Sequence, residues 1–138
     1  MQFFSVKNKI SFIICLATLP ITSFAVNIQN NYTLTLINHY SSPLTFSGRQ
    51  NATDVLPELP AIIEEKNQIT TKVVDIGKHA YVRVDGEDKK HSAFFGVEVA
   101  NNEVKVHGYL SKGIAYSWKK SVVTFCSPDD YQKKGFCE

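Results

Sequence analysis

The chain has 138 residues, of which 15 are basic and 13 are acidic, so its formal net charge is +2. This length suits one domain with a real hydrophobic core and is too short for two domains of ordinary size. The charge is too small for the overall electrostatic footprint of a nucleic-acid-binding protein, whose affinity rests largely on neutralising phosphates. We therefore expect one domain that does not bind nucleic acid.

The first 25 residues have the order of a secretory signal peptide. They open with two lysines and no acid, continue with a mostly apolar run over residues 10–21, and end with the small residues Ser23 and Ala25. The apolar run is about a dozen residues long, which is too short to span a bilayer. We expect residues 1–25 to be removed on export, leaving residues 26–138 as one secreted or periplasmic β-domain.

Removal of this segment changes both the charge and the cysteine count. Its two lysines account for the whole excess of base over acid, so the remaining 113 residues are formally neutral, with 13 residues of each sign. Cys15 leaves with the segment, so Cys126 and Cys137 remain as an even pair in an oxidising compartment. We expect these two cysteines to form a disulfide that ties the C-terminal tail back to the strand ending at Cys126. Closing such a loop stabilises the fold by about 3 kcal/mol.

The rest of the chain alternates polar and apolar residues with a period of two, which is typical of β-strands. In chain order, we expect strands at residues 32–37, 44–47, 68–75, 80–84, 92–100, 103–110, 114–118 and 121–126. The first two runs should form a hairpin or lie side by side, because turn-forming residues join them. Residues 49–60 are expected to be a loop, and residues 61–66 to be either a helical turn or an edge strand.

About seven to eight short strands with tight turns predict an all-β fold. The two architectures that fit are a single, mainly antiparallel β-sandwich and a small β-barrel, and the sequence leaves both open. The core should be built from apolar residues that share the inward phase of their strands. These residues are Val82, Val84, Phe95, Val97, Val99, Val104 and Val106.

No set of residues has the spacing of a known catalytic or metal site. Four histidines are scattered along the chain: His39, His79, His91 and His107. None has the spacing of a metal-binding pair, so we expect solvated histidines and no metal, although folding can still bring two of them together. The acidic turn at residues 85–88 lacks the ligand spacing of an EF-hand loop and should be a plain hairpin turn. There is no Gly-x-Ser-x-Gly motif. We expect no cofactor, and the residues give no argument for an enzyme.

Residues 105–120 have the composition of a binding surface. The candidate ligand-binding residues are Lys105, His107, Tyr109, Ser111, Lys112 and Tyr116. By strict alternation the first four project outward from one strand, and Lys112 lies at a tight turn. Aromatic and cationic groups on a sheet face can stack on sugars or attract an acidic protein surface. Tyr116 has an alternative place in the core, and Trp118, the only tryptophan, is more typical of a core residue.

The segment Ser111-Lys112-Gly113-Ile114-Ala115-Tyr116 is similar to the Ser-Gly-x-x-Tyr loop of periplasmic lysozyme inhibitors, except that Lys112 separates the serine from the glycine. The resemblance covers six residues. It implies a small exported β-barrel with a disulfide, whose loop places a serine and a cation into the lysozyme cleft.

The leading expectation is an exported, non-enzymatic β-sandwich domain that binds a protein or glycan partner outside the cytoplasm, as a secreted bacterial factor. The short signal and the content of Asn, Lys and Ile favour a bacterial source. The alternatives are an inhibitor of a cell-wall hydrolase, a small secreted hydrolase whose site residues are far apart in sequence, and a membrane-active β-protein. No transmembrane segment is expected.

Overall fold

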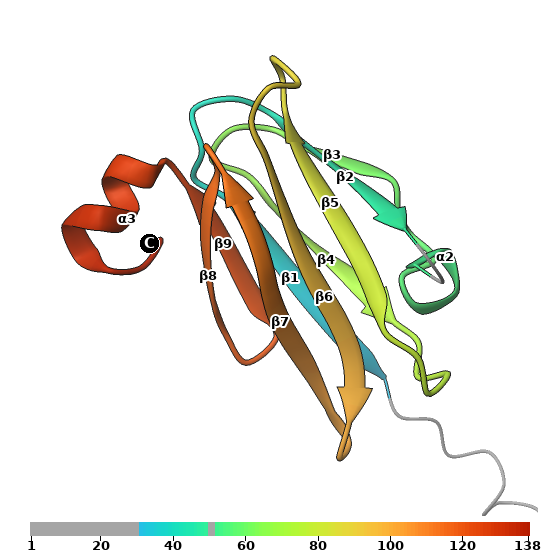
Figure 1. Ribbon diagram of the computed structural model, residues 1–138. Coiled ribbons are helices and arrows are strands. Elements are labelled where there is room, and N and C mark those ends of the chain that lie inside the picture. Colours follow the sequence, from blue (N-terminus) through green and yellow to red (C-terminus); the bar gives the residue numbers. More distant parts are fainter. Residues whose placement is uncertain (1–30, 50–51) are drawn as a thin grey trace, which may run out of the picture. The chain divides into compact units, whose positions relative to one another are not determined.

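The computed structural model describes residues 31–49 and 52–138. The expected signal peptide, with Cys15, therefore lies outside the described residues. The described residues form two facing layers of β-sheet with two short helices (Figure 1).

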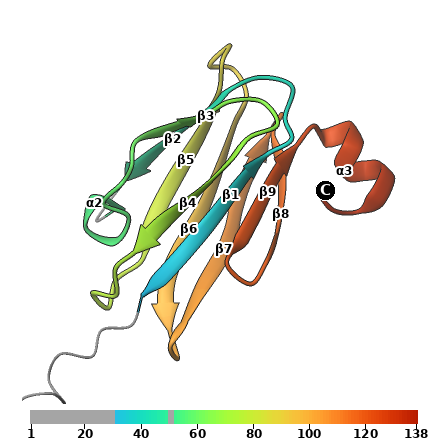
Figure 2. The same ribbon diagram turned by 180° about the vertical axis from the view of Figure 1, so that it is seen from behind.

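The first sheet consists of β1 (Tyr32–Asn38), β4 (Gln68–Val73), β8 (Ala115–Lys119) and β9 (Val122–Cys126), in the spatial order β4–β1–β9–β8. The second sheet consists of β2 (Leu44–Arg49), β3 (Ala61–Ile63), β5 (Ala80–Gly86), β6 (Ser92–Ala100) and β7 (Glu103–Lys112), in the order β3–β2–β5–β6–β7. Both sheets are open within the described part of the chain, as the reverse view in Figure 2 also shows. The fold is therefore a β-sandwich and not a closed barrel.

The sandwich is mainly antiparallel, as expected. Only β1 and β9 pair in parallel among the named strands of the described residues. The expectation that the first two strands pair is wrong, because β1 lies in one sheet and β2 in the other. Asn38, which is fully buried, holds the crossing between them: its side chain accepts from Tyr40 N at 2.8 Å and donates to the carbonyls of Ser42 and Ile63, each at 2.9 Å.

All eight expected strands are present, and the ambiguous segment after residue 60 supplies β3 at the edge of the second sheet. The segment expected to be a loop contains the short helix α2 (Ala52–Val55). A second helix, α3 (Pro128–Lys134), follows β9. Its start is fixed by Ser127, whose hydroxyl accepts from Asp130 N at 3.2 Å, and its end by Gly135 at φ 79°. Neither described helix is long and apolar enough to cross a membrane.

The hydrophobic core lies between the two sheets. Most of the expected core residues are buried in it: Val82, Val84, Phe95, Val97 and Val106. Val99 and Val104, which pair near the tip of the β6–β7 hairpin, are only partly buried against this core. At its centre, the Phe125 ring lies 5.2 Å from that of Phe46 and 5.9 Å from that of Phe95. The inward phases expected for β5 and β6 are thus confirmed.

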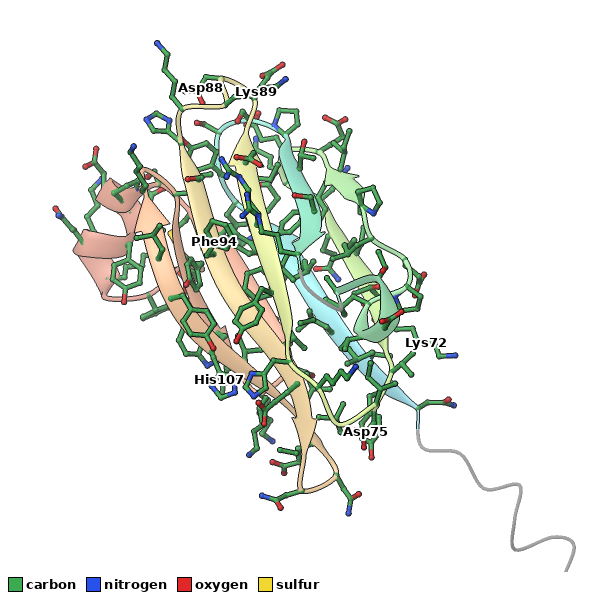
Figure 3. The ribbon with its side chains drawn as sticks, turned by 45° about the vertical axis from the view of Figure 1, so that its right-hand side comes forward. Lys72, Asp75, Asp88, Lys89, Phe94 and His107 are labelled. Atoms are coloured by element: carbon green, nitrogen blue, oxygen red, sulfur yellow. A yellow bond between two sulfur atoms is a disulfide. The ribbon has the colours of Figure 1, made fainter. Side chains whose placement is uncertain are left out.

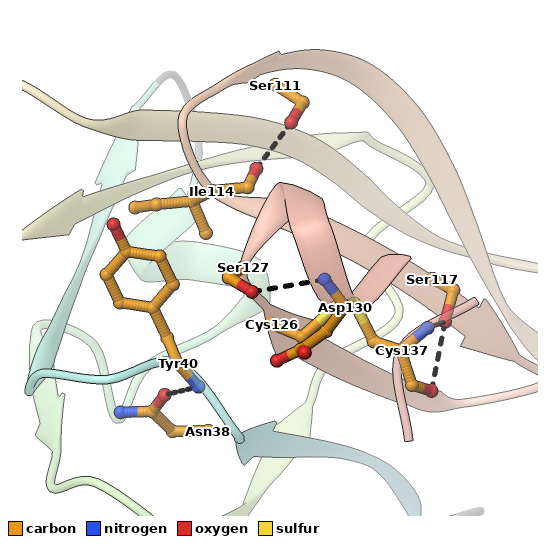
Figure 4. The surroundings of a disulfide bond; sticks show 9 residues. All are labelled: Asn38, Tyr40, Ser111, Ile114, Ser117, Cys126, Ser127, Asp130 and Cys137. Atoms are coloured by element: carbon orange, nitrogen blue, oxygen red, sulfur yellow. Dashed lines mark hydrogen bonds between the residues drawn. A yellow bond between two sulfur atoms is a disulfide. The ribbon is translucent and has the colours of Figure 1, made fainter. Parts of the chain in front are cut away.

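The expected disulfide between Cys126 and Cys137 is present, with a Cα–Cα distance of 5.5 Å (Figure 4). Together with Ala115, the two cysteines form a small buried cluster separate from the main core. The chain end is also held by Ser117, whose Oγ accepts from Cys137 N at 2.9 Å. The tail with α3 is therefore tied to β8 and β9, as the sequence predicted.

Candidate functional site

The outward phases of β5, β6 and β7 form one continuous surface, which we call the outer face. It is the side of the five-stranded sheet that faces away from the core, and Figure 3 shows it with Phe94 and His107 labelled. Its residues are Tyr81, Arg83 and Asp85 on β5, Phe94, Gly96 and Glu98 on β6, and Lys105, His107 and Tyr109 on β7. Their strand neighbours on the other phase are core residues, so the alternation of the sequence directly separates core from surface.

Aromatic rings occupy the middle of the outer face. The rings of Tyr81 and Tyr109 lie 5.6 Å apart at a tilt of 45°, and Tyr109 is 54 % exposed. Gly96 lies beneath Tyr109, where an added Cβ would come within 2.7 Å of the Tyr109 ring. The missing side chain at Gly96 therefore lets the Tyr109 ring lie across the sheet. Desolvation, the neighbouring Tyr81 and the Glu98 carboxylate raise the pKa of Tyr109, so its hydroxyl is neutral at physiological pH.

Two guanidinium groups flank the ring of Phe94, which is the third aromatic ring in the middle of the outer face. The Phe94 ring centroid lies 5.5 Å from the Arg49 guanidinium and 5.8 Å from that of Arg83, within the range of cation–π attraction. Arg83 Nε also donates to both carboxylate oxygens of Asp85 at 2.9 Å. An open depression of about 430 Å³ lies here, lined by Arg49, Tyr81, Phe94, Tyr109 and Leu110. It offers apolar ring surface beside polar donors and acceptors.

A β-bulge in β7 changes which side chains reach the outer face. Phe94 pairs with Leu110 and Phe95 with Gly108, so Tyr109 is an extra residue in β7. Leu110, which is 53 % exposed, therefore joins the outer face. Ser111 pairs with the buried Ala93 and does not share the phase of His107. Ser111 is exposed at the end of β7 but does not share the outer face with the three candidates before it, because strict alternation ends at the bulge.

Tyr116 supports the outer face from within the sandwich. Its half-buried ring lies 5.8 Å from that of Phe125, and burial raises the pKa of its hydroxyl. That hydroxyl donates to the Phe94 carbonyl and accepts from Tyr109 N at 2.9 Å. Since a bulge interrupts the ladder of backbone hydrogen bonds, Tyr116 satisfies two backbone groups that the bulge affects.

Trp118 is not a core residue, contrary to expectation. It is 44 % exposed on β8, which is an edge strand, and its ring stacks on Tyr116 with 6.0 Å between centroids. An added Cβ on Gly108 would lie 2.7 Å from the Trp118 ring. The indole therefore covers the gap between the edges of the two sheets, β7 and β8.

The remaining candidates, Lys105, Ser111 and Lys112, do not lie together. The Lys105 ammonium pairs with Glu103 at 2.9 Å on the outer face. Lys112 is exposed at the end of β7, about 20 Å further along the strand by the usual rise per residue. The Ser111 hydroxyl donates to the carbonyl of Ile114 within its own turn. The structure thus brings Lys105, His107 and Tyr109 together on one face, and leaves Ser111, Lys112 and Tyr116 outside that group.

Two histidines and a glutamate form a cluster at one end of the outer face. His79 Nε2 contacts Glu98 Oε2, and His107 Nε2 lies 3.4 Å from the same oxygen. The two imidazole rings stack with 5.4 Å between centroids. One potential ligand atom from each of the three residues lies within 4.8 Å of the others. Imidazole and carboxylate are ligand types that transition metals take, so these residues can hold a metal ion.

The sequence reasoning missed His79 and Glu98. Glu98 and His107 lie on the outward phases of one hairpin, and the pairing of Gly96 with His107 makes them diagonal neighbours. His79 lies one residue before Ala80, which pairs with Val97, so His79 comes opposite Glu98. No short sequence motif marks this cluster. It could be recognised only from the register in which β5, β6 and β7 pair.

The acidic turn after β5 is a hairpin turn, as expected. The Asp88 carboxylate accepts from Lys90 N at 3.0 Å and from His91 N at 3.2 Å. These backbone hydrogen bonds lower the pKa of Asp88. Its carboxylate is thus used to hold the turn.

Comparison with known proteins gives no assignment: no protein-family model, no curated protein and no solved structure matches this chain significantly. The candidate function therefore rests on the geometry of the outer face.

Proposed function

We propose that this protein is an exported, non-enzymatic β-sandwich domain that binds a glycan through the outer face. The observation that carries this proposal is the group of rings and guanidinium groups around the depression lined by Arg49, Tyr81, Phe94, Tyr109 and Leu110. An aromatic ring offers an apolar surface on which a sugar ring can stack, and a tyrosine adds a hydroxyl that can hydrogen-bond. Shallow sites of this kind combine apolar contact with a few oriented polar groups.

The charges on the outer face favour a glycan over an acidic protein. Arg83 is paired with Asp85, and Lys105 is paired with Glu103. These two cations already have acidic partners, and Arg49 is the one cation at the depression with no ion pair among the described residues, so the face has little net positive potential to steer an acidic protein toward it. The exposed ring of Tyr109 and the partly exposed rings of Tyr81 and Phe94 need no charged partner, so they can contact a neutral sugar.

The proposed export rests on the signal-like order of residues 1–25, and the Cys126–Cys137 disulfide is consistent with it. Disulfides form and persist in oxidising compartments such as the periplasm and the extracellular medium. Inhibition of a cell-wall hydrolase through residues 111–116 has weaker support, since the hydroxyls of Ser111 and Tyr116 are hydrogen-bonded to backbone carbonyls of the fold.

The test is binding of the purified protein to an array of bacterial and host glycans, followed by titration of the best glycan. Tyr109→Ala should weaken binding about five- to tenfold, which corresponds to the roughly 1 kcal/mol expected of one aromatic contact. Tyr131→Ala is the matched control, because Tyr131 is also an exposed tyrosine but belongs to α3. It should bind as the wild type does.

Absence of binding to any glycan, or equal affinity of wild type and Tyr109→Ala, would contradict the proposal. A pull-down from envelope or host extracts tests for a protein partner instead. Suppose that no glycan binds and that the wild type recovers a protein which a Tyr109→Ala/Lys112→Glu variant does not. The ligand of this domain would then be that protein and not a glycan.

A further inference from the structure

We propose that His79, Glu98 and His107 form a binding site for one divalent transition-metal ion, with Zn²⁺ as the ion that fits the ligand set best. The proposal does not depend on glycan binding, because the cluster lies beside the depression and none of its residues lines it. Two imidazole nitrogens and one carboxylate oxygen make a set of three protein ligands, as in zinc sites that keep a further position open for water or another ligand.

Two of the three ligands lie on paired strands of the second sheet, and the third directly precedes a strand of the same sheet. Glu98 and His107 belong to the long antiparallel pair β6–β7, and His79 directly precedes β5, which pairs with β6. The His79 ring is further held by stacking on Tyr81, with 6.3 Å between centroids and an angle of 22°. Glu98 and His107 are carried by paired strands and are thus positioned before the ion arrives, so little ordering of these two ligands is needed on binding.

The distances within the cluster fit a metal ion. Two ligand atoms bound to one tetrahedral Zn²⁺ at about 2.0–2.1 Å lie about 3.4 Å from each other. The distance between His107 Nε2 and Glu98 Oε2 is 3.4 Å. His79 Nε2 contacts Glu98 Oε2 directly, so these two side chains must separate slightly to admit the ion. All three ligand atoms already lie within 4.8 Å of one another.

The surroundings of His107 Nε2 agree with this. Its Nε2 atom is buried and makes no hydrogen bond with any of the described residues. Its nearest printed contact is the ion pair with Glu98 Oε2 at 3.4 Å, which is longer than a normal hydrogen bond, and a bound ion between the two atoms would satisfy both. The nearest cation on the opposing strand, Lys105, is paired with Glu103, which leaves the Glu98 carboxylate to the two imidazoles.

The ligand set also determines which metals should bind. Ca²⁺ and Mg²⁺ take oxygen ligands almost exclusively, and one carboxylate is too few for them. Imidazole nitrogen suits Zn²⁺, Ni²⁺ and Cu²⁺. We therefore expect binding of Zn²⁺ and Ni²⁺ and no binding of Ca²⁺ or Mg²⁺ at this cluster.

The test is isothermal titration of Zn²⁺ into the full chain without a histidine tag, after removal of metals with a chelator. Wild type should bind one Zn²⁺ per chain. His79→Ala and His107→Ala should each weaken Zn²⁺ binding at least tenfold. Loss of a residue that only orients a metal ligand already lowers metal affinity about tenfold or more, and loss of the ligand itself should lower it at least as much. Glu98→Gln, which keeps the size of the side chain, should also weaken it. His39→Ala is the matched control, since His39 is an exposed histidine outside the cluster, and it should bind as wild type does.

Circular dichroism and the thermal unfolding midpoint of each variant separate loss of the site from loss of the fold. In folded protein, Zn²⁺ should raise the midpoint of wild type and of His39→Ala, and should not raise that of Glu98→Gln. No binding by wild type at Zn²⁺ concentrations up to about 1 mM would overturn the proposal. Equal binding by wild type and a His79→Ala/His107→Ala variant would overturn it too, since the ion would then be held elsewhere.

Discussion

Phe94 and Phe95 are adjacent in the sequence and lie in opposite environments. Phe95 is fully buried, with its ring 5.9 Å from that of Phe125 and 6.2 Å from that of Tyr116. Phe94 points to the outer face, between two guanidinium groups. The two-residue period of a strand accounts for this difference, because both residues belong to β6 and successive side chains of a strand point to opposite faces.

We expect Phe95→Ala to lower the free energy of unfolding by about 3–5 kcal/mol, since it leaves a cavity in the core. Phe94→Ala removes the same atoms from the surface and should cost about 1 kcal/mol or less. Urea unfolding of both variants measures the two values. Equal costs would show that the phase assigned to β6 is wrong.

At the scale of elements, the edges of the two sheets meet at β7 and β8. An open edge strand exposes unpaired backbone groups and needs protection. Here the Trp118 ring of β8 lies over Gly108 of β7, and the Tyr116 hydroxyl reaches the backbone beside the bulge. The side chains of β8 therefore hold β7, and with it the Tyr109 ring, in place.

Gly108→Ala tests this edge contact. The new Cβ would lie 2.7 Å from the Trp118 ring, so the indole must move into solvent. We expect the fluorescence of Trp118, the only tryptophan of the chain, to shift to longer wavelength. The loss of stability should be about 1 kcal/mol or less, because the ring lies at an exposed edge and can yield.

Gly86→Ala is the control for that experiment. Its added Cβ would come no closer than 3.4 Å to any atom outside its chain neighbours, and it lies in the β5–β6 hairpin. Its fluorescence should match that of the wild type. An unchanged spectrum for Gly108→Ala would show that Trp118 does not cover Gly108.

At the scale of the whole molecule, a modest sandwich is reinforced at its C-terminal end. The core between the sheets does not include the tail, which instead has its own buried cluster of Ala115, Cys126 and Cys137. A disulfide stabilises mainly by restricting the unfolded chain, and it persists only where the environment is oxidising. The stability that the disulfide gives to the fold therefore depends on the oxidising compartment that the proposed export would provide.

The proposed export predicts the mature form of the protein. Mass spectrometry of the protein isolated from its native host should find an N-terminus at or near Val26, because cleavage is expected after Ala25. The same measurement should find Cys126 and Cys137 oxidised. Retention of residues 1–25, or a lipid group on Cys15, would contradict the proposed signal peptide.

The sequence by itself determined the strand positions, the inward phases of β5 and β6 and the Cys126–Cys137 pair. Strand phase depends on alternation among near neighbours, and the disulfide partner follows once Cys15 is assigned to the signal peptide. Only the tertiary structure decided that β1 and β2 separate, that Tyr109 is an extra residue in β7, and that His79 meets Glu98 and His107. Those outcomes depend on the register between strands, which is set by contacts between residues far apart in the chain.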